Sequence, residues 1–197
     1  MADLSSVGVV ILAAGSSRRL GRPKQLLELE GKPLLQHVID AVGAVGVGQI
    51  VVVLGHAADQ IQAALTLPQH AKVVVNLDHA RGQGSSVRAG LDRLSPHMGR
   101  AVILLGDQPR VAPDAIRAVA EGTGPIVRAV YRGTPGHPVA FDRDVWAELA
   151  TTAVGDQGGR ELLRRDPQRV HEVALDQPSP LDIDTEDDYM RVLRSGR

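Results

Sequence analysis

The stretch VGVVILAAGSSRRLGRPK, which runs from Val7 to Lys24, says most about how this chain folds. It begins with an almost unbroken run of Val, Ile and Leu, which is typical of a strand covered on both faces of a sheet. It continues into a turn of small residues, followed by arginines and a lysine. Because the turn follows a buried strand directly, we expect it at the carboxyl edge of an α/β sheet, where such folds bind ligands.

The same rhythm of short apolar runs and helix-period segments continues along the chain. We predict strands at Val7–Ala13, Gln49–Leu54, Lys72–Asn76, Ala101–Leu105, Ile126–Tyr131 and Val170–Leu175. Helices are predicted over residues 34–45, around Ile61, from near Ser85, after Pro113, over Val145–Ala150 and at the C-terminal end. The pattern indicates one α/β domain over residues 1–197, with a Rossmann-like, mostly parallel sheet and helices on both faces.

Two segments late in the chain are predicted to be loops because they are rich in glycine and proline. They are Arg132–Pro138 and Gly155–Gly159. Close to the C-terminus, Thr185 and Asp188 resemble the capping pair that begins a helix.

The composition narrows the functional classes. A formal charge of −1 over 197 residues gives no global field for nucleic acid or an anionic membrane, so we expect neither partner. The chain has no cysteine, which excludes disulfides, a thiolate nucleophile and Cys-ligated zinc. No apolar run is long enough to cross a bilayer and the N-terminus does not resemble a signal peptide, so we expect a soluble, cytoplasmic protein.

The N-terminal turn has the chemistry of a polyphosphate cradle. Small residues at positions 13–17 let backbone N–H groups approach an anion, and Arg19 and Lys24 add positive charge. Five residues separate Gly15 from Gly21, so the spacing of a Walker A loop is absent, as is the Gly-x-Gly-x-x-Gly fingerprint of dinucleotide sites. The alternative is a basic surface turn.

Three carboxylates are candidate metal ligands. Asp107 follows a predicted buried strand, between Gly106, which we expect to let a ligand come close, and a proline. Magnesium prefers a few hard oxygens, usually one or two carboxylates with phosphates and water. Asp182 and Asp184 are the candidates for a second carboxylate, and alternation predicts that both face the same way. The alternatives are a turn-forming Asp107 and a helix-capping role for one of the other two.

The segment Gly82–Val87 precedes a predicted helix, so Ser85 and Ser86 are expected at its start with free N–H groups and hydroxyls. Such groups can recognise a base or ribose. Plain capping of the helix is the alternative reading for either serine.

The string from Leu12 to Lys24 resembles the signature loop of the MobA-like nucleotidyltransferases, and most closely that of the molybdenum cofactor cytidylyltransferases. The resemblance implies a fold of the nucleotide-diphospho-sugar transferase type. It implies that the loop holds the triphosphate and that Lys24 and Arg19 stabilise the transferred α-phosphate. It also implies that Asp107 binds the metal and that the segment with Ser85 and Ser86 recognises the nucleoside. The loop residues expected to hold the nucleotide are Leu12, Ala13, Ala14 and Gly15.

Two later segments resemble acceptor-side motifs of the same family, Gly136–Val139 and Gly155–Arg160. The resemblance implies that a phosphorylated pterin is held there by His137, Pro138, Asp156 and Arg160. The chain departs from the usual pattern twice, with Gly159 in place of alanine and Glu186 in place of proline. Without the resemblance, both segments would read as ordinary surface loops.

The implied reaction is the Mg²⁺-dependent transfer of a cytidylyl group from CTP to molybdenum cofactor (molybdopterin), with release of pyrophosphate. The pair Ala13-Ala14 resembles the cytidine-using branch, and another NTP remains an alternative. A client molybdoenzyme is a further implied partner. Two other functions stay open, namely nucleotidyl transfer to a sugar or alcohol phosphate, and a non-catalytic nucleotide-binding accessory role for a molybdoenzyme.

Overall fold

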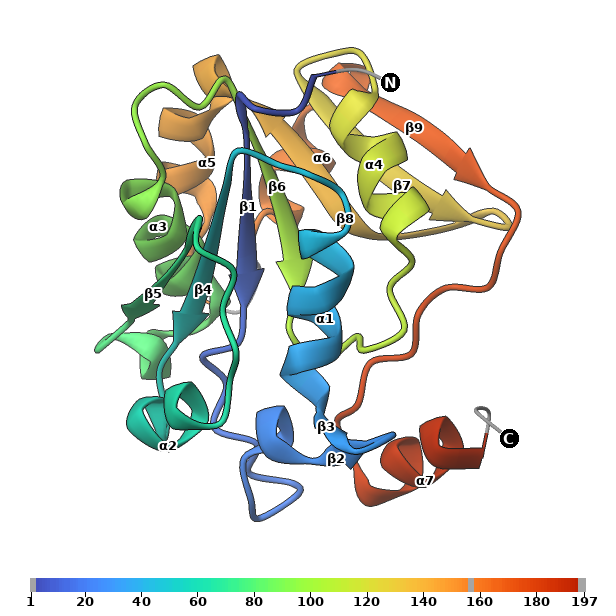
Figure 1. Ribbon diagram of the computed structural model, residues 1–197. Coiled ribbons are helices and arrows are strands. Elements are labelled where there is room, and N and C mark those ends of the chain that lie inside the picture. Colours follow the sequence, from blue (N-terminus) through green and yellow to red (C-terminus); the bar gives the residue numbers. More distant parts are fainter. Residues whose placement is uncertain (1–2, 156–157, 195–197) are drawn as a thin grey trace.

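The computed structural model describes residues 3–155 and 158–194 of the chain. A seven-stranded sheet forms its centre, in the order β5-β4-β1-β6-β8-β7-β9 (Figure 1). Its strands are β1 Val7–Leu12, β4 Gln49–Leu54, β5 Ala71–Val75, β6 Arg100–Leu105, β7 Ile126–Tyr131, β8 Thr134–Asp142 and β9 Val170–Leu175. A small hairpin of β2 Glu28–Leu29 and β3 Lys32–Pro33 lies apart from the sheet.

The described residues include seven α-helices. They are α1 Leu34–Gly43, α2 Ala58–Ala63, α3 Gln83–Arg93, α4 Pro113–Glu121, α5 Trp146–Thr152, α6 Arg160–Arg165 and α7 Glu186–Arg194. Helix α4 begins with proline, whose missing N–H costs nothing at a first helical position. None of the described helices combines the length and the apolar character that crossing a bilayer requires.

The sheet is mostly parallel, as predicted. Strand β1 pairs in parallel with β4 and β6, and β7 pairs in parallel with β9. Only β8 runs antiparallel to both of its neighbours, β6 and β7. Because β1, β4 and β6 are parallel neighbours, their carboxyl ends meet at one edge of the sheet, towards α7 in Figure 1.

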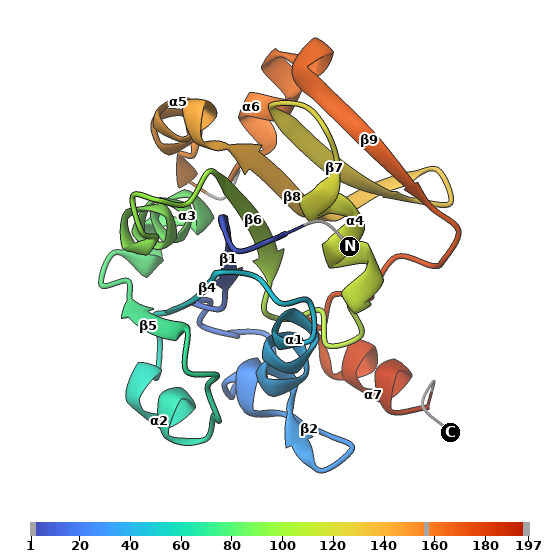
Figure 2. The same cartoon turned by 45° about the horizontal axis from the view of Figure 1, so that its top comes forward.

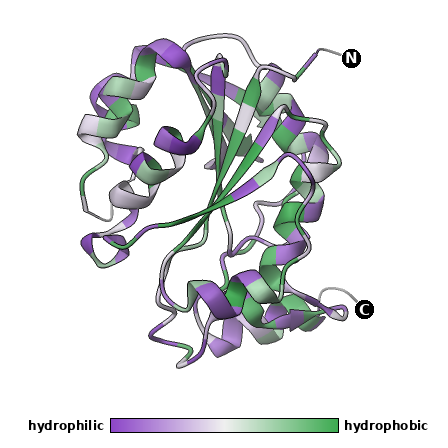
Figure 3. Cartoon of the chain, turned by 60° about the vertical axis from the view of Figure 1, so that its left-hand side comes forward, coloured by the Kyte–Doolittle hydropathy of each residue, from purple (hydrophilic) through white to green (hydrophobic). Residues whose placement is uncertain are grey.

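Helices cover both faces of the sheet (Figure 2). Side chains of β1 alternate between the two cores, with Val9 and Ile11 on the side of α1 and α4, and Val10 and Leu12 on the side of α3, α5 and α6. Hydrophobic residues therefore line the strands and the inner faces of the helices (Figure 3). This explains why the strands read as continuous apolar runs in the sequence.

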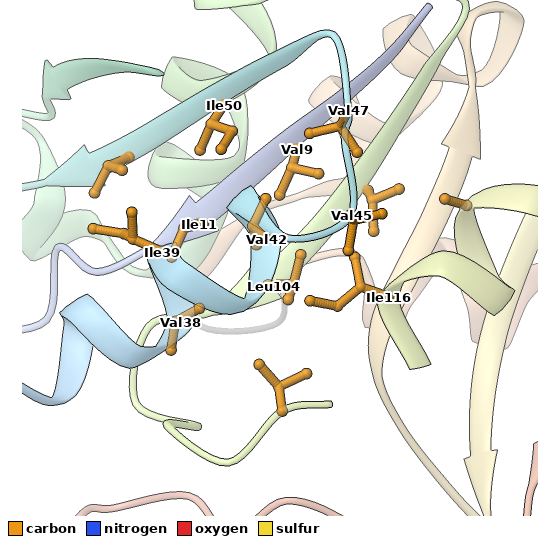
Figure 4. Close-up of a cluster of buried hydrophobic side chains, with 14 of the residues drawn as sticks. Val9, Ile11, Val38, Ile39, Val42, Val45, Val47, Ile50, Leu104 and Ile116 are labelled. Atoms are coloured by element: carbon orange, nitrogen blue, oxygen red, sulfur yellow. The ribbon is translucent and has the colours of Figure 1, made fainter. Parts of the chain in front are cut away.

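The core on the α1 side is built by the helical period of residues 34–45. Val38, Ile39 and Val42 of α1 lie against Val9 and Ile11 of β1 and have no solvent exposure (Figure 4). Burying one such side chain contributes about 1.5–3 kcal/mol relative to leaving it exposed. The core holds β1 rigidly, and therefore fixes the start of the loop that follows it.

A smaller apolar cluster attaches the C-terminal segment to the N-terminal third of the chain. Its buried members come from the β2–β3 region, the start of α1 and the C-terminal segment: Leu27, Leu29, Leu34, Ile183 and Val192. Helix α7 begins with the predicted capping pair, in which Asp188 accepts hydrogen bonds from the N–H and the hydroxyl of Thr185 at 3.0 and 2.7 Å. The N–H of Asp188 donates back to the Thr185 hydroxyl at 3.2 Å. The cluster and the cap together fix the segment that precedes the helix.

Most strands lie where the sequence predicts them, with ends that differ by about one residue. The prediction of a loop over Arg132–Pro138 is wrong, because residues 134–142 form β8. Arg132 and Gly133 have φ values of 45° and 86°, and this tight turn folds the following residues back against β7. Glycine and proline have a low intrinsic preference for strands, which is why the sequence predicts a loop here. Pairing with β6 and β7 nevertheless holds these residues in a strand, and this pairing is not visible in the local sequence.

Candidate active site

A cavity of about 470 Å³ opens at the carboxyl end of β1 and β6. It is lined on one side by the loop from Ala13 to Arg18, on another by Lys24 and Asp107, and on a third by the start of α3. This volume lies within the range of small-molecule and cofactor sites. The predicted nucleotide-binding residues Leu12, Ala13, Ala14 and Gly15 all line it.

The loop after β1 is held close to the end of β6. The N–H of Gly106 donates to the carbonyl of Leu12 at 2.9 Å, and a side chain added at Gly106 would place its Cβ 2.8 Å from that of Ala13. Glycine at position 106 therefore leaves room for the loop itself, and because Gly106 also lines the cavity, the expectation that it lets a ligand come close stays a prediction. The close packing places Asp107 beside the loop.

The cationic loop and the acidic strand ends meet at Lys24. Its ammonium nitrogen lies 2.5 Å from Asp107 Oδ2 and 2.8 Å from Asp184 Oδ1. Arg19 donates to the other oxygen of Asp184 at 2.8 Å. The Lys24 and Asp107 side chains are only 15% and 17% exposed, so this pair is shielded from solvent, whereas Arg19 is 67% exposed. Four of the predicted functional residues, Lys24, Arg19, Asp107 and Asp184, thus form one cluster.

The charges of this cluster change the proton affinities of its members. Burial on its own would lower the pKa of Lys24, but the charges of Asp107 and Asp184 outweigh it and raise that pKa. Burial would raise the pKa of Asp184, but Lys24 and Arg19 hold it below its usual value. For Asp182, burial and the negative charge of Asp107 both raise the pKa. Among residues 3–155 and 158–194, no Lys or Arg side chain forms an ion pair with Asp182.

The C-terminal segment delivers Asp182 and Asp184 through the residue between them. Ile183 is fully buried in the small apolar cluster, and its N–H donates to the carbonyl of Asp107 at 3.1 Å. Asp182 accepts a hydrogen bond from Gln108 at 2.7 Å, while Asp184 faces Lys24. The two carboxylates thus have different hydrogen-bond partners, and the expectation from alternation that both face the same way stays a prediction.

The donor set fits a hard divalent cation. Asp107 Oδ1 is buried and has no hydrogen-bond partner, so a carboxylate oxygen is left for a ligand that is not protein. Over residues 3–155 and 158–194, no group of three acidic, His or Cys side chains is arranged to hold a metal alone. Magnesium usually takes only one or two carboxylates and completes its shell with phosphate and water. The residues present suit that kind of site.

The two predicted serines differ in what they can offer. The N–H of Ser85 donates to the carbonyl of Gly82 at 3.2 Å, and its hydroxyl lies 2.8 Å from the same oxygen. The expectation of free groups at Ser85 is therefore wrong, because both groups are already bonded in the first turn of α3. Ser86 accepts a hydrogen bond from buried Asn76 at 3.0 Å and lines the cavity, where its hydroxyl can still donate.

The acceptor-side candidates lie next to this cavity. His137 and Arg160 line a small apolar hollow of about 40 Å³, which also includes Leu12 and Gln83 of the larger cavity's lining. His137 Nδ1 lies 3.3 Å from the carbonyl of Ile103, and burial lowers its pKa. Pro138 is buried within β8, and the predicted residue Asp156 lies outside the described residues.

Three functional candidates were not predicted as site residues from the sequence. Arg18 lines the cavity, whereas the neighbouring Arg19 turns to Asp184. Gln25, next to Lys24, is 2% exposed and also lines the cavity. Gln108, next to Asp107, is 5% exposed and orients Asp182. For the two glutamines, the sequence offered one signal, namely their position next to Lys24 and Asp107. A buried side-chain amide is usually hydrogen-bonded, so a glutamine beside a functional charge is a candidate for orienting the site.

Comparisons with known proteins agree with this geometry. A family model described as the MobA-like NTP transferase domain matches residues 9–172. The nicotine blue oxidoreductase of Paenarthrobacter nicotinovorans is 33% identical over 202 residues, which cover 97% of this chain and 98% of that protein.

Solved structures share the fold over nearly the whole chain. Rv0371c of Mycobacterium tuberculosis H37Rv is 37% identical with a TM-score of 0.88, and the match covers 98% of this chain and 100% of that one. Its complex with manganese matches at 37% identity with a TM-score of 0.84, over 96% and 98% of the two chains. A nucleotidyl transferase from Methanothermobacter is 25% identical with a TM-score of 0.82, over 96% of each chain. These relatives include both a nucleotidyl transferase and an oxidoreductase.

Proposed function

Because the chain belongs to the MobA-like NTP transferase family, we propose that it transfers the cytidylyl group of CTP to molybdenum cofactor and releases pyrophosphate, with magnesium as the metal. The choice of CTP rests on the pair Ala13-Ala14. The choice of a phosphorylated pterin as acceptor rests on the motifs around His137 and Arg160. A client molybdoenzyme would receive the product.

One observation carries the proposal. Lys24, Asp107 and Asp184 come from three distant parts of the chain and meet in one cluster, and Lys24 and Asp107 line the cavity together with the loop of small residues. A triphosphate needs positive charge, free backbone N–H groups and a metal-binding carboxylate within a few ångströms of one another. A basic surface turn would need none of the acidic partners.

The reaction follows from alignment and charge. An oxygen of the acceptor phosphate attacks the α-phosphorus, the new P–O bond forms, and the bond to the β-phosphate oxygen breaks as pyrophosphate leaves with the electron pair. The attacking oxygen is already anionic near neutral pH, so no general base is required. Lys24 and Arg19 release Asp184 and neutralise the negative charge that develops around the α-phosphorus.

The metal would be held by Asp107 together with Asp182 or Asp184. The buried, unpaired Oδ1 of Asp107 and the raised pKa of Asp182 support this assignment. When bound, magnesium supplies Lewis-acid neutralisation of phosphate charge. Rv0371c, which is 37% identical to this chain, has been solved in complex with manganese, and this supports a divalent cation as the metal.

A binding panel followed by a turnover assay tests the proposal. CTP, GTP, UTP and ATP are compared by thermal shift in the presence of magnesium. A ligand at 100 times its dissociation constant raises the free energy of unfolding by about 2.7 kcal/mol. Pyrophosphate release is then measured with CTP and molybdenum cofactor, and with sugar and alcohol phosphates in parallel. Pyrophosphate release with molybdenum cofactor as acceptor, and not with the sugar or alcohol phosphates, supports the proposal. Stabilisation by GTP alone contradicts the cytidine assignment, and binding without release from any acceptor indicates an accessory protein.

A second candidate is an oxidoreductase activity, favoured by the near end-to-end match to nicotine blue oxidoreductase. A cradle for a triphosphate could also hold the pyrophosphate of a nicotinamide dinucleotide, although the usual Gly-x-Gly-x-x-Gly fingerprint is absent after β1. The test is the oxidation of NADH or NADPH with nicotine blue as acceptor, followed by nicotinamide absorbance. Oxidation of NADH or NADPH in this assay, with no pyrophosphate release from CTP, would show that the protein is an oxidoreductase and not a nucleotidyltransferase.

A further inference from the structure

We propose that Gln25 is a positioning residue that holds the nucleotide loop with its free N–H groups available to phosphate oxygens. The inference rests on the proposed function, since it names the residue that prepares the same site for a triphosphate. Gln25 follows Lys24 directly, and the two share one 3₁₀ turn, Lys24–Leu26. The same short element therefore carries both the cation and the clamp.

The clamp consists of two hydrogen bonds to the loop backbone. Gln25 Nε2 donates to the carbonyl of Ala13 at 2.7 Å and to the carbonyl of Gly15 at 3.1 Å. The N–H of Lys24 donates to the hydroxyl of Ser17 at 3.0 Å. The turn thus engages the loop at every second residue. A loop of small residues would otherwise have wide conformational freedom.

The direction of these bonds determines where the neighbouring N–H groups point. In a planar trans peptide, the C=O of one residue and the N–H of the next lie on opposite sides. Because Gln25 holds the carbonyls of Ala13 and Gly15, the N–H groups of Ala14 and Ser16 point away from it. Both residues line the cavity, and within the described part of the chain neither N–H has a hydrogen-bond partner. Two such donors are what a phosphate requires.

The amide of Gln25 acts as a donor and not as an acceptor. Its Oε1 is buried and unpaired, so only Nε2 has a role in the protein. Gln25→Met keeps the length of the side chain and removes the donor. Gln25→Glu keeps the shape but sets a carboxylate oxygen against two carbonyl oxygens. Gln36→Met is the matched control, because Gln36 is also buried and also donates to a backbone carbonyl, that of Thr66 at 3.0 Å, away from the cavity.

The probes are CTP and inorganic tripolyphosphate, each titrated calorimetrically with magnesium into the folded variants. Gln25→Met is expected to raise the dissociation constant for both probes by about tenfold or more, since a misplaced loop loses bonds to the phosphates. Gln36→Met is expected to leave both constants within about twofold. The KM for CTP should rise more than kcat falls. Equal tripolyphosphate affinity in wild type and Gln25→Met, or an equal loss in Gln36→Met, would overturn the proposal.

Hydrogen exchange without ligand gives a second readout. It does not depend on activity or on charge repulsion between the variant side chain and a bound phosphate. The amides of Ala13, Leu20 and Lys24, whose hydrogen bonds hold the two ends of the loop, should exchange faster in Gln25→Met and in Gln25→Glu, but not in Gln36→Met. Unchanged exchange there in either Gln25 variant counts against the clamp. If tripolyphosphate binding depends on Gln25 but the wild-type protein releases no pyrophosphate from CTP, the proposed cytidylyl transfer is contradicted and the clamp is not. If cytidylyl transfer proceeds equally well in Gln25→Met, the clamp is contradicted and the proposed transfer is not.

Discussion

The ammonium nitrogen of Lys24 lies 2.5 Å from a carboxylate oxygen of Asp107, although 83 positions separate the two residues in the sequence. Lys24 follows the loop after β1, and Asp107 follows β6. These strands are parallel neighbours, so their carboxyl ends meet. The contact joins the basic turn to the acidic strand end, and the proposed chemistry depends on that junction.

Replacing the cation at this junction should abolish most turnover. Lys24→Ala is expected to lower pyrophosphate release by about 100-fold or more, because a preorganised charge aimed at the transition state is lost. Lys32→Ala is the control, since Lys32 pairs with Asp40 at 2.7 Å on the surface. The assay uses saturating CTP and folded protein verified by circular dichroism. Turnover of Lys24→Ala close to that of Lys32→Ala would refute the assignment.

Removing Lys24 should also change metal affinity in the absence of nucleotide. Its ammonium group lies between Asp107 and Asp184, so a cation that binds these oxygens must displace it. We expect Lys24→Met to bind Mn²⁺ about tenfold more tightly than wild type by electron paramagnetic resonance, a difference of about 1.4 kcal/mol. Asp107→Asn should weaken binding. Unchanged affinity in Lys24→Met would mean that the metal binds elsewhere.

The C-terminal segment should matter for the site beyond its effect on stability. Ile183→Ala is expected to lower the free energy of unfolding by about 2–5 kcal/mol, because the side chain is fully buried. It should also weaken Mn²⁺ binding, since Ile183 fixes the backbone between Asp182 and Asp184. Leu29→Ala truncates the same apolar cluster without touching that backbone. The free energy of unfolding in urea and the affinity for Mn²⁺ are measured for both variants. An equal loss of Mn²⁺ affinity in Ile183→Ala and Leu29→Ala would contradict the prediction.

Stability should fall at high pH because of Tyr131. Burial raises the pKa of this phenol from 10.0 to about 12, so the folded protein keeps its proton where the unfolded chain loses it. This contribution to stability is present below pH 10 and is lost as the pH rises towards 12, by at most about 1.4 kcal/mol per pH unit. Urea unfolding between pH 9 and 12 measures it, with Tyr131→Phe as the control. A parallel decline in both proteins would show that other groups are responsible.

The sequence determined the fold class through local patterns. Val9 to Leu12 read as a strand buried on both faces, and residues 34–45 read as an amphipathic helix, because alternation and helical period depend only on neighbouring residues. The capping pair at Thr185 and Asp188 was equally local and is confirmed. Strand β8 was missed, because its glycine and proline are held in a strand by pairing with β6 and β7.

The partners of the site residues were decided by the tertiary structure alone. The sequence supplied Lys24, Asp107 and a choice between Asp182 and Asp184, and it left open which charges would touch. Packing of Ile183 in a cluster built from the other end of the chain turned Asp184 towards Lys24 and Asp182 towards Gln108. Residue types and spacing define which chemistry is possible, but contacts across more than a hundred positions depend on how buried surfaces fit together. That fit is a property of the whole core and cannot be read from a local pattern.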